Sequence, residues 1–279
     1  MIYSIDTEKY IDRMASFVKR VTGFDINLKN PVTINDKLCW LNIYEPMKLK
    51  TKCADKILLH DYCKEKLGVD LCVPIIKVYN HAGEIKWDEL PERFVMKCNH
   101  GSGMNIIVKD KSKLDIHGAM LRINKWMNWD FSMANGFEAH YHDIERKIFV
   151  EEYIEQDGDI PKDYKFLCFN GEPKYVEVIG NRFNSGKYMN YYDMDFNFQI
   201  ITRNDFHNNP NIHDEKPKCF EQMKEFARKL SDDFKFVRVD FYEIDGKIYL
   251  GELTFTPGAF VFTYKDPNDH LRVGNMLKI

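Results

Sequence analysis

Two acidic residues near the end of the chain, Asp240 and Glu252, stand on strand-like runs that flank an Asp245-Gly246 turn. Asp-Gly between alternating apolar runs is a strong hairpin signal, so the two runs are expected to pair and bring the carboxylates together. Adjacent carboxylates repel unless a cation lies between them, and Mg²⁺ is the usual cation where the partner is a nucleotide. The hairpin therefore predicts a metal-phosphate site, with Asp240 and Glu252 as metal ligands.

Two further polar side chains belong to this hairpin. Arg238 precedes Asp240 by two residues and Thr254 follows Glu252 by two, so each shares a strand face with its neighbouring acid. The Thr254 hydroxyl is a candidate third metal ligand. The Arg238 guanidinium is a candidate catalytic group, because a cation beside a metal-phosphate centre stabilises charge that builds in a transition state. The alternative is a structural Arg-Asp pair on a polar sheet face.

A lysine at a strand end forms a second candidate site. Lys97 ends the apolar run 94–97, and a loop of small and polar residues follows. Glycines let backbone N–H groups approach phosphate oxygens, and the ammonium group neutralises their charge. Neither GxxxxGK[ST] nor GxGxxG is present, and an ordinary hairpin loop with a surface lysine is the alternative. The candidate phosphate-binding loop consists of His100, Gly101, Ser102 and Gly103.

An acidic strand end forms a third candidate site. The strand-like run that starts near residue 147 ends in Glu151, Glu152, Tyr153 and Ile154. Such a strand can offer one carbonyl and one N–H to an adenine edge, and a carboxylate there can accept a hydrogen bond from the exocyclic amine. The alternative is a solvated strand end without a ligand.

The elements that must position these residues alternate between helices and hairpins. Helical spacing predicts helices over residues 8–22, 33–47, 56–67, 112–129 and 217–233, and Asp55 and Gly68 can cap the two ends of the third. Strands are expected over 71–79, 94–97, 106–108, 147–154, 164–169 and 173–179, in addition to the two strands of the Asp245-Gly246 hairpin. Residues 181–213 are polar and are expected to be irregular. This order predicts an α+β fold rather than a βαβ series.

Composition excludes several classes of protein. The 279 residues are 44% apolar, which supports a sizeable core, and the net charge of −3 gives no footprint for nucleic acid. No apolar run is long enough for a transmembrane segment, and no signal peptide is visible. The seven cysteines stand singly, without a CxxC pair, which favours reduced thiols in a cytoplasmic protein. Cys63 and Cys72 are expected to be packing residues.

The three candidate sites, in this order, resemble the ATP-grasp superfamily. The hairpin resembles the Arg-x-Asp, Glu-x-Asn and Pro-Gly pattern of D-alanine–D-alanine ligases, with Thr254 in place of the asparagine. The resemblance implies ATP and Mg²⁺ as cofactors and two α+β subdomains that clasp ATP. It implies that Lys56 and Lys97 hold phosphates, that residues 100–103 close over the γ-phosphate, and that residues 151–154 hold adenine. Asp163 falls where a ribose-binding acid would lie, and Lys165 belongs to the same motif.

A narrower resemblance accounts for the threonine. The motifs around Lys56, Lys97, Glu151 and Asp163, together with Gly-Glu-Leu-Thr-Phe-Thr-Pro-Gly at 251–258, are similar to the TupA-like ATP-grasp family, where threonine is expected. The similarity spans roughly residues 30–279. It implies a helical N-terminal region over 1–54, a small subdomain with its linker over 55–154, and a large subdomain with the metal site over 155–279. Residues 1–54 are too short for the full amino-terminal domain of many ligases, so a reduced acceptor surface is expected.

The family resemblance also implies a function. It predicts an ATP-dependent carboxylate–amine ligase that acts through an acyl phosphate in surface-polysaccharide biosynthesis, with a uronic-acid carboxylate and an amino acid or other amine as substrates. Association with polysaccharide-assembly enzymes is expected. A glycosyltransferase and a sugar kinase are the alternatives, although no DxD motif with other support is present.

Overall fold

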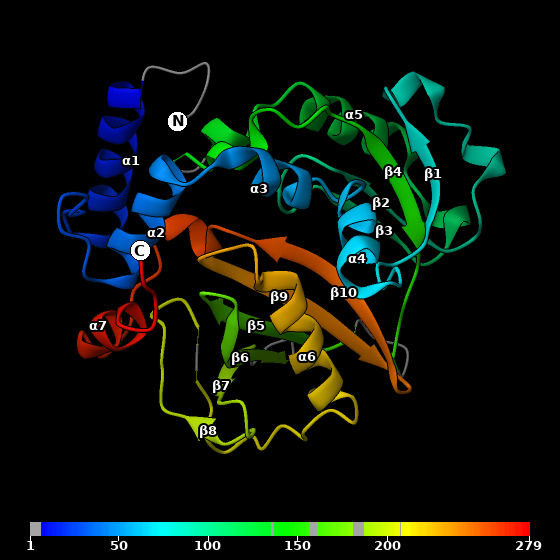
Figure 1. The fold of residues 1–279 in the computed structure, drawn as a ribbon. Coiled ribbons are helices and arrows are strands. Elements are labelled where there is room, and N and C mark those ends of the chain that lie inside the picture. The colour runs from blue at the N-terminus through cyan, green and yellow to red at the C-terminus, as the bar shows by residue number, and fades with distance from the viewer. Residues whose placement is uncertain (1–6, 135–136, 157–160, 181–186, 207) are drawn as a thin grey trace.

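The fold consists of two antiparallel sheets and a helical N-terminal region (Figure 1). The structure is a computed structural model that describes residues 7–134, 137–156, 161–180, 187–206 and 208–279. The small sheet has the strand order β1-β4-β2-β3, and the large sheet has the order β10-β9-β5-β6-β7-β8. The α+β fold predicted from the sequence is confirmed.

The helices and strands follow the chain in this order. The helices are α1 (Thr7–Thr22), α2 (Ile34–Tyr44), α3 (Met47–Ala54), α4 (Leu59–Leu67), α5 (Ile116–Met127), α6 (Phe220–Ser231) and α7 (Asn268–Gly274). The strands of the small sheet are β1 (Ile75–Tyr79), β2 (Phe94–Cys98), β3 (Asn105–Val108) and β4 (Ile148–Glu152). The strands of the large sheet are β5 (Asp163–Phe169), β6 (Glu172–Gly180), β7 (Tyr188–Tyr192), β8 (Phe198–Gln199), β9 (Phe236–Ile244) and β10 (Lys247–Thr254).

Two sequence-based predictions differ from the structure. The helix predicted over 33–47 ends at Tyr44, because Pro46 cannot continue α2 and instead precedes a further helix, α3, that was not predicted. The segment 181–213, predicted to be irregular, contains β7 and β8. Pairing with β6 buries all five residues of β7, and the polar Asn190 among them is satisfied by Asp214 and neighbouring carbonyls. Those partners lie about 20 residues away in sequence, so the polar residues of this segment wrongly indicated a segment without strands. Residues 181–186 and 207 lie outside the described residues.

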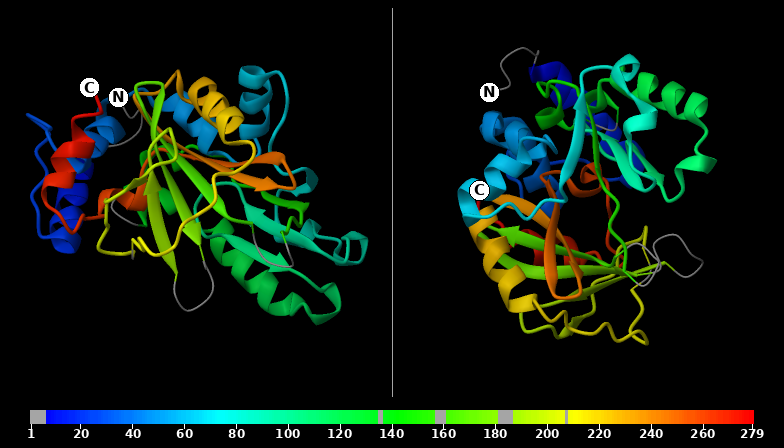
Figure 2. Two further views of the ribbon diagram at one scale, coloured as in Figure 1. Left: turned by 90° about the horizontal axis from the view of Figure 1, so that it is seen from below. Right: turned by 90° about the vertical axis from the view of Figure 1, so that its right-hand side faces the viewer.

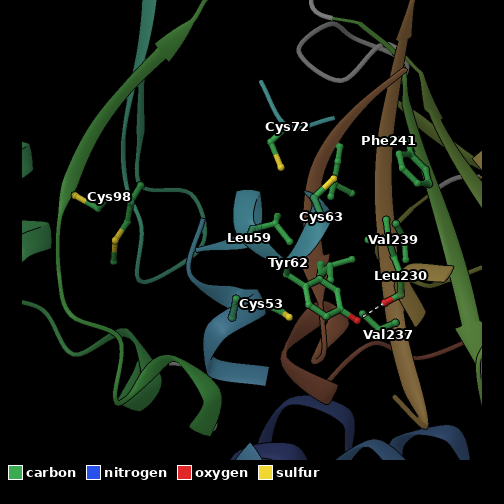
Figure 3. Packing of buried hydrophobic residues seen from close by; sticks show 14 of the residues in the cluster. Cys53, Leu59, Tyr62, Cys63, Cys72, Cys98, Leu230, Val237, Val239 and Phe241 are labelled. Atoms are coloured by element: carbon green, nitrogen blue, oxygen red, sulfur yellow. Dashed lines mark hydrogen bonds between the residues drawn. The ribbon is translucent and has the colours of Figure 1, made fainter. Parts of the chain in front are cut away.

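The large sheet has one apolar face and one polar face. On β9, Val237, Val239 and Phe241 are buried and pack with the apolar side of α6. The intervening residues Arg238 and Asp240 therefore point to the opposite face, because strand side chains alternate. Helix α4 is tied to this layer by the Tyr62 hydroxyl, which donates a hydrogen bond of 3.1 Å to the Leu230 carbonyl of α6 (Figure 3).

A bulge in the β9–β10 hairpin decides where Glu252 points. Asp245 and Gly246 take φ values of 51° and 81°, as the predicted Asp-Gly turn requires. A regular ladder from that turn would place Glu252 opposite Val239, on the α6 side. The register shifts between Leu250 and Glu252, so Glu252 pairs with Asp240. Gly251 permits the bulge, since a Cβ there would lie 2.9 Å from the Tyr242 ring.

The small sheet turns partly exposed side chains toward the large one. On β2, Phe94, Met96 and Cys98 are buried, whereas Val95 and Lys97 are half-buried. On β3 the same alternation leaves Asn105 and Ile107 exposed. Figure 2 shows the two sheets facing each other across the middle of the molecule.

The N-terminal helices pack against the large sheet rather than standing apart. Met14 of α1 and Leu38 of α2 share a buried cluster with Phe169 of β5 and Val273 of α7. A second cluster of buried hydrophobic residues, from Cys53 to Phe255 along the chain, includes residues of both sheets. The domain boundaries at 54/55 and 154/155 therefore stay a prediction. None of the helices in the described ranges combines the length and the apolarity that crossing a bilayer demands.

Candidate active site

A cavity of about 330 Å³ lies between the two sheets. Its polar lining comes from segments far apart in the sequence that are brought together by the fold. The charged residues that line it are Lys56, Lys97, Glu151, Asp163, Lys165, Asp240 and Glu252. Ser102 and Gly103 of the predicted phosphate-binding loop line it too, as do Tyr153 and Ile154 of the predicted adenine-binding strand end.

The hairpin acids form a compact charged cluster at one wall of the cavity. The Arg238 guanidinium donates to both carboxylate oxygens of Asp240, at 2.7 and 2.6 Å, and to Glu252 Oε1 at 3.2 Å. Thr254 Oγ1 donates to the same Glu252 oxygen at 3.0 Å and accepts from Arg238 at 3.1 Å. Lys165 Nζ forms an ion pair with Asp240 and lies 3.5 Å from Asp163 Oδ1. Lys165 from β5 and Arg238 from β9 therefore compensate the negative charge of the hairpin carboxylates.

Charge compensation keeps Glu252 ionised. Burial by itself would raise its pKa, but the cations Lys56, Arg238 and Lys165 outweigh burial and lower the pKa of Glu252 to about 2. For Asp240, burial dominates and raises the pKa, against the opposing effect of Arg238 and Lys165. The Glu252 side chain is 31% exposed and opens into the cavity. An anionic oxygen is thus available to a cation in the cavity at neutral pH.

The donor set of this wall fits Mg²⁺. Two carboxylates paired across β9 and β10 and a hydroxyl beside them are oxygen donors, which hard divalent cations prefer. Arg238 and Lys165 compensate the negative charges of these acids, and a divalent cation would supply further compensation of the same kind. Asp240 and Glu252 would hold the ion, and Thr254 orients Glu252 through its hydrogen bond.

A second charged group lies where the small sheet meets α4. Lys97 Nζ forms an ion pair with Glu151 across the paired strands β2 and β4. Lys56 Nζ donates a hydrogen bond of 2.5 Å to the Gly101 carbonyl, and burial lowers the pKa of Lys56. Asp55 Oδ1 accepts the Ile57 N–H at 2.9 Å and so fixes the turn that carries Lys56. The positive charge of Lys97 lies close enough to lower the pKa of Lys56 further.

Apolar residues in the same cavity were missed by sequence reasoning. Val95 and Ile107 face the cavity from the small sheet, and Val73 and Met104 complete this apolar lining. Ile107 is 39% exposed, although strand isoleucines usually lie in the core. An apolar wall of this kind suits a flat aromatic base. The available signal was the alternation along 94–98, which leaves Val95 on the same face as Lys97.

Several predicted site residues lie outside the lining of this cavity. His100 is buried, and its Nε2 lies 3.0 Å from the Trp126 carbonyl of α5. Glu152 is exposed and lies on the strand face opposite to Glu151. Gly101 takes part only through its carbonyl, and Arg238 and Thr254 contact the lining carboxylates without themselves being part of the lining. Roles for His100 and Glu152 therefore stay predictions.

Glu138 gives the protein an expected pH dependence. It is buried near the acid cluster, accepts a hydrogen bond from Thr256, and burial raises its pKa to about 7 from 4.5. Between these two pH values the unfolded chain releases a proton that the folded chain keeps. The free energy of unfolding should therefore fall as pH rises through this window, by about 3 kcal/mol in all. Glu138→Gln stays neutral, so urea unfolding should show a smaller loss of stability between pH 5 and pH 8.

The glutamine variant has a built-in control, because its amide oxygen can still accept the Thr256 hydrogen bond. Stability at pH 4.5 and below should then be similar in the two proteins. Equal pH slopes for the two proteins between pH 5 and pH 8 would show that Glu138 titrates normally.

Three of the solved structures that are similar to this chain are ligases or synthases by name. D-alanine–D-alanine ligase from Bacillus anthracis, solved in complex with ATP, is 15% identical over 73% of this chain and 55% of that one, with a TM-score of 0.44. The ligase from Helicobacter pylori is 17% identical over 88% of this chain and 67% of that one, with a TM-score of 0.48. N5-carboxyaminoimidazole synthase from Aspergillus clavatus is 12% identical over 73% of this chain and 44% of that one, with a TM-score of 0.41. The chain thus spans little more than half the length of the Bacillus ligase.

None of the curated proteins compared with the chain matches it. The family model described as TupA-like ATPgrasp matches residues 36–278. This match covers both sheets, the charged cavity between them and the Arg238–Thr254 hairpin. The chain therefore belongs to the TupA-like ATP-grasp family.

Proposed function

We propose that the protein is an ATP-dependent ligase that joins a carboxylate to an amine through an acyl phosphate. The convergence of two lysines, two paired carboxylates and an apolar wall on one cavity carries this proposal. Each part matches one part of a magnesium nucleotide: cations for phosphates, carboxylates for the metal ion, and an apolar surface for the base. Membership of the ATP-grasp family supports the same activity.

ATP would occupy the cavity in a single orientation. The base would contact Val95, Ile107 and Ile154, with Glu151 and the backbone of residues 152–154 at its polar edge. Lys56 and Lys97 would hold phosphates, and residues 101–103 lie against Lys56 at the same end. Asp163, at the start of β5, would accept a hydrogen bond from the ribose. Mg²⁺ held by Asp240 and Glu252 would supply charge neutralisation of the phosphate oxygens.

The chemistry then needs positioning rather than a covalent enzyme intermediate. An oxygen of the substrate carboxylate attacks the γ-phosphorus and ADP leaves, which yields an acyl phosphate. The amine then attacks the acyl carbon, phosphate leaves with the C–O bond electrons, and the nitrogen loses a proton. Arg238, which is held by two hydrogen bonds to Asp240, would stabilise negative charge on the reacting oxygens.

The proposed substrates are a uronic-acid carboxylate and an amino acid in surface-polysaccharide biosynthesis. Two cationic residues near the large sheet are candidates for contact with a negatively charged acceptor. They are Arg203, which is buried and paired with Asp205, and Lys187, which lies 4.2 Å from the Phe206 ring. Lys165 belongs instead to the acid cluster, and Arg182 lies outside the described residues. ATP as substrate and the free thiols among the described residues support a cytoplasmic location. Association with polysaccharide-assembly enzymes stays part of this proposal.

Product analysis tests the proposed reaction. The protein is incubated with ATP, Mg²⁺, a panel of uronates and mixed amino acids, and the products are analysed by mass spectrometry. We expect an amide whose mass equals the sum of uronate and amino acid less one water, formed with one ADP per amide. A phosphorylated sugar without amide would indicate a sugar kinase, and ATP-independent cleavage of a nucleotide sugar would indicate a glycosyltransferase. The uronate proposal fails if no uronate and amine pair raises ADP release.

A further inference from the structure

Three side chains with metal-ligating atoms meet beside α4, outside the group of acids assigned to Mg²⁺. They are His60 on α4 and Asp70 and Cys72 on the segment that follows it, and their ligand atoms lie within 4.8 Å of one another. His60 Nδ1 lies 2.7 Å from Asp70 Oδ2. We propose that these three residues bind a zinc ion, a site separate from that of the nucleotide metal.

The local backbone brings the three donors together. Gly68 ends α4 with a φ of 75°, which turns the chain back along the helix. Asp70 Oδ1 then accepts the backbone N–H of Cys72 at 2.9 Å, so Asp70 and Cys72 are held side by side opposite His60. The turn is built from local contacts and presents the donors before any ion is bound.

A second thiol adjoins the cluster. Cys63 lies three residues after His60 on α4, so the two side chains share one side of the helix. The Cys63 thiol donates a hydrogen bond of 3.6 Å to the Val69 carbonyl and accepts the Leu71 N–H at 3.3 Å, and Figure 3 shows Cys63 and Cys72 next to each other. The sequence predicted packing roles for both cysteines, because nine residues separate them and they form no CxxC pair. The turn at Gly68 brings the two cysteines together, which places Cys63 beside the cluster.

The donor chemistry selects zinc over magnesium. Imidazole nitrogen, thiolate sulfur and carboxylate oxygen are all zinc ligands, at about 2.0–2.3 Å from the ion, whereas Mg²⁺ disfavours sulfur. Ligand atoms around a tetrahedral zinc ion lie roughly 3.3–3.7 Å apart, so the 4.8 Å limit must contract by about 1 Å. The 2.7 Å hydrogen bond between His60 and Asp70 must open as the ion enters. The His60 and Asp70 side chains are 18% and 40% exposed, which leaves an entry path for the ion. Binding releases the Cys72 thiol proton to solvent.

The position of the site gives the ion a structural role. The Leu250 N–H of β10 donates to the Leu71 carbonyl at 2.8 Å, next to Cys72, and Leu250 lies two residues before Glu252. On the side of the proposed zinc site that faces the nucleotide cavity, His60 follows Lys56 by four residues. A small cavity lined by Lys56, His60, Cys72 and Gly251 lies between the two sites. A zinc ion here would fasten the Lys56 turn to the strand that carries Glu252.

Cobalt substitution tests the proposal on the full chain. The protein is purified under reducing, metal-free conditions and titrated with Co²⁺, which reports a bound thiolate by charge-transfer absorption. We expect one equivalent to produce this absorption and Zn²⁺ to abolish it by displacement. Cys72→Ser should lose the band, whereas Cys219→Ser, which removes a half-exposed thiol that bonds to the Gly246 carbonyl, should keep it.

Further variants separate this site from the nucleotide metal site. Glu252→Gln should keep the thiolate band, since carboxylates produce none. In chelator competition, His60→Ala and Asp70→Asn should weaken Zn²⁺ binding by more than the roughly 10–100-fold typical of losing an outer partner of a metal ligand. The proposal is overturned if the wild-type protein shows no thiolate band with Co²⁺, or if folded Cys72→Ser binds Zn²⁺ as tightly as wild type. The first criterion uses the wild-type protein, so an unfolded variant cannot obscure it.

Discussion

Replacing Glu252 by glutamine should lower the turnover of the proposed ligase reaction by about 100-fold or more, with little change in fold. The amide keeps the size and the hydrogen-bond acceptor that Thr254 and Arg238 use, but it removes the negative charge. That charge is held at neutral pH because three cations lower the pKa of Glu252 to about 2. Without it, Asp240 would be the one carboxylate left of the two that are proposed to hold Mg²⁺. The measurement is ADP release over a range of Mg²⁺ concentrations.

A matched control lies on the same hairpin. Glu243→Gln removes one negative charge from β9, at a position that pairs with Ile248 and does not line the cavity. Its turnover should stay within about two-fold of wild type, as for other substitutions away from the site. Turnover by Glu252→Gln equal to that of this control would rule out a metal role for Glu252.

Replacing Arg238 by methionine should destabilise the protein by about 3 kcal/mol and also abolish most turnover. Arg238 makes both hydrogen bonds of a fork with Asp240, whose side chain is only 3% exposed. Breaking a buried ion pair from one side leaves an uncompensated charge, which costs about 3–5 kcal/mol. Lys165 still pairs with Asp240, so the lower end of that range is expected. Urea unfolding in the absence of divalent cations measures the loss.

Magnesium gives this second prediction its control. If Asp240 and Glu252 form the metal site, Mg²⁺ can supply the positive charge that the variant lacks. Adding Mg²⁺ should therefore raise the free energy of unfolding more in Arg238→Met than in wild type. Arg238→Lys should be intermediate, because an ammonium keeps the charge but cannot form the fork. Equal Mg²⁺ stabilisation in all three proteins would argue against an ion at these carboxylates.

Much of this site was predictable from local sequence. Asp245-Gly246 predicts the hairpin because few residue pairs accept two successive positive φ values. Lys97 at the end of an apolar strand, Glu151 at the end of another, and the Arg238–Gly258 motif could each be read from residue type and spacing. Their order along the chain predicted the family, which the match over residues 36–278 confirms.

Local sequence was less informative where partners are distant. The strand β7 depends on pairing with β6 and on Asp214, so its polar residues predicted loop instead of sheet. The apolar wall of the cavity looked like ordinary core, since an isoleucine on a strand carries no mark of exposure. Cys63 and Cys72 looked independent until the turn at Gly68 brought them together.

The Glu252 side chain shows most clearly which features local sequence determined and which depended on tertiary structure. The sequence by itself determined that two acids flank a tight hairpin and that an arginine and a threonine accompany them. Strict alternation from that hairpin places Glu252 on the α6 side of the sheet, away from Asp240. Only the tertiary structure, through the bulge at Gly251, turned Glu252 toward the cavity. The physical reason is that a bulge depends on how β10 packs against its neighbours, including the 2.8 Å bond from Leu250 to Leu71, and no local residue pattern records that contact.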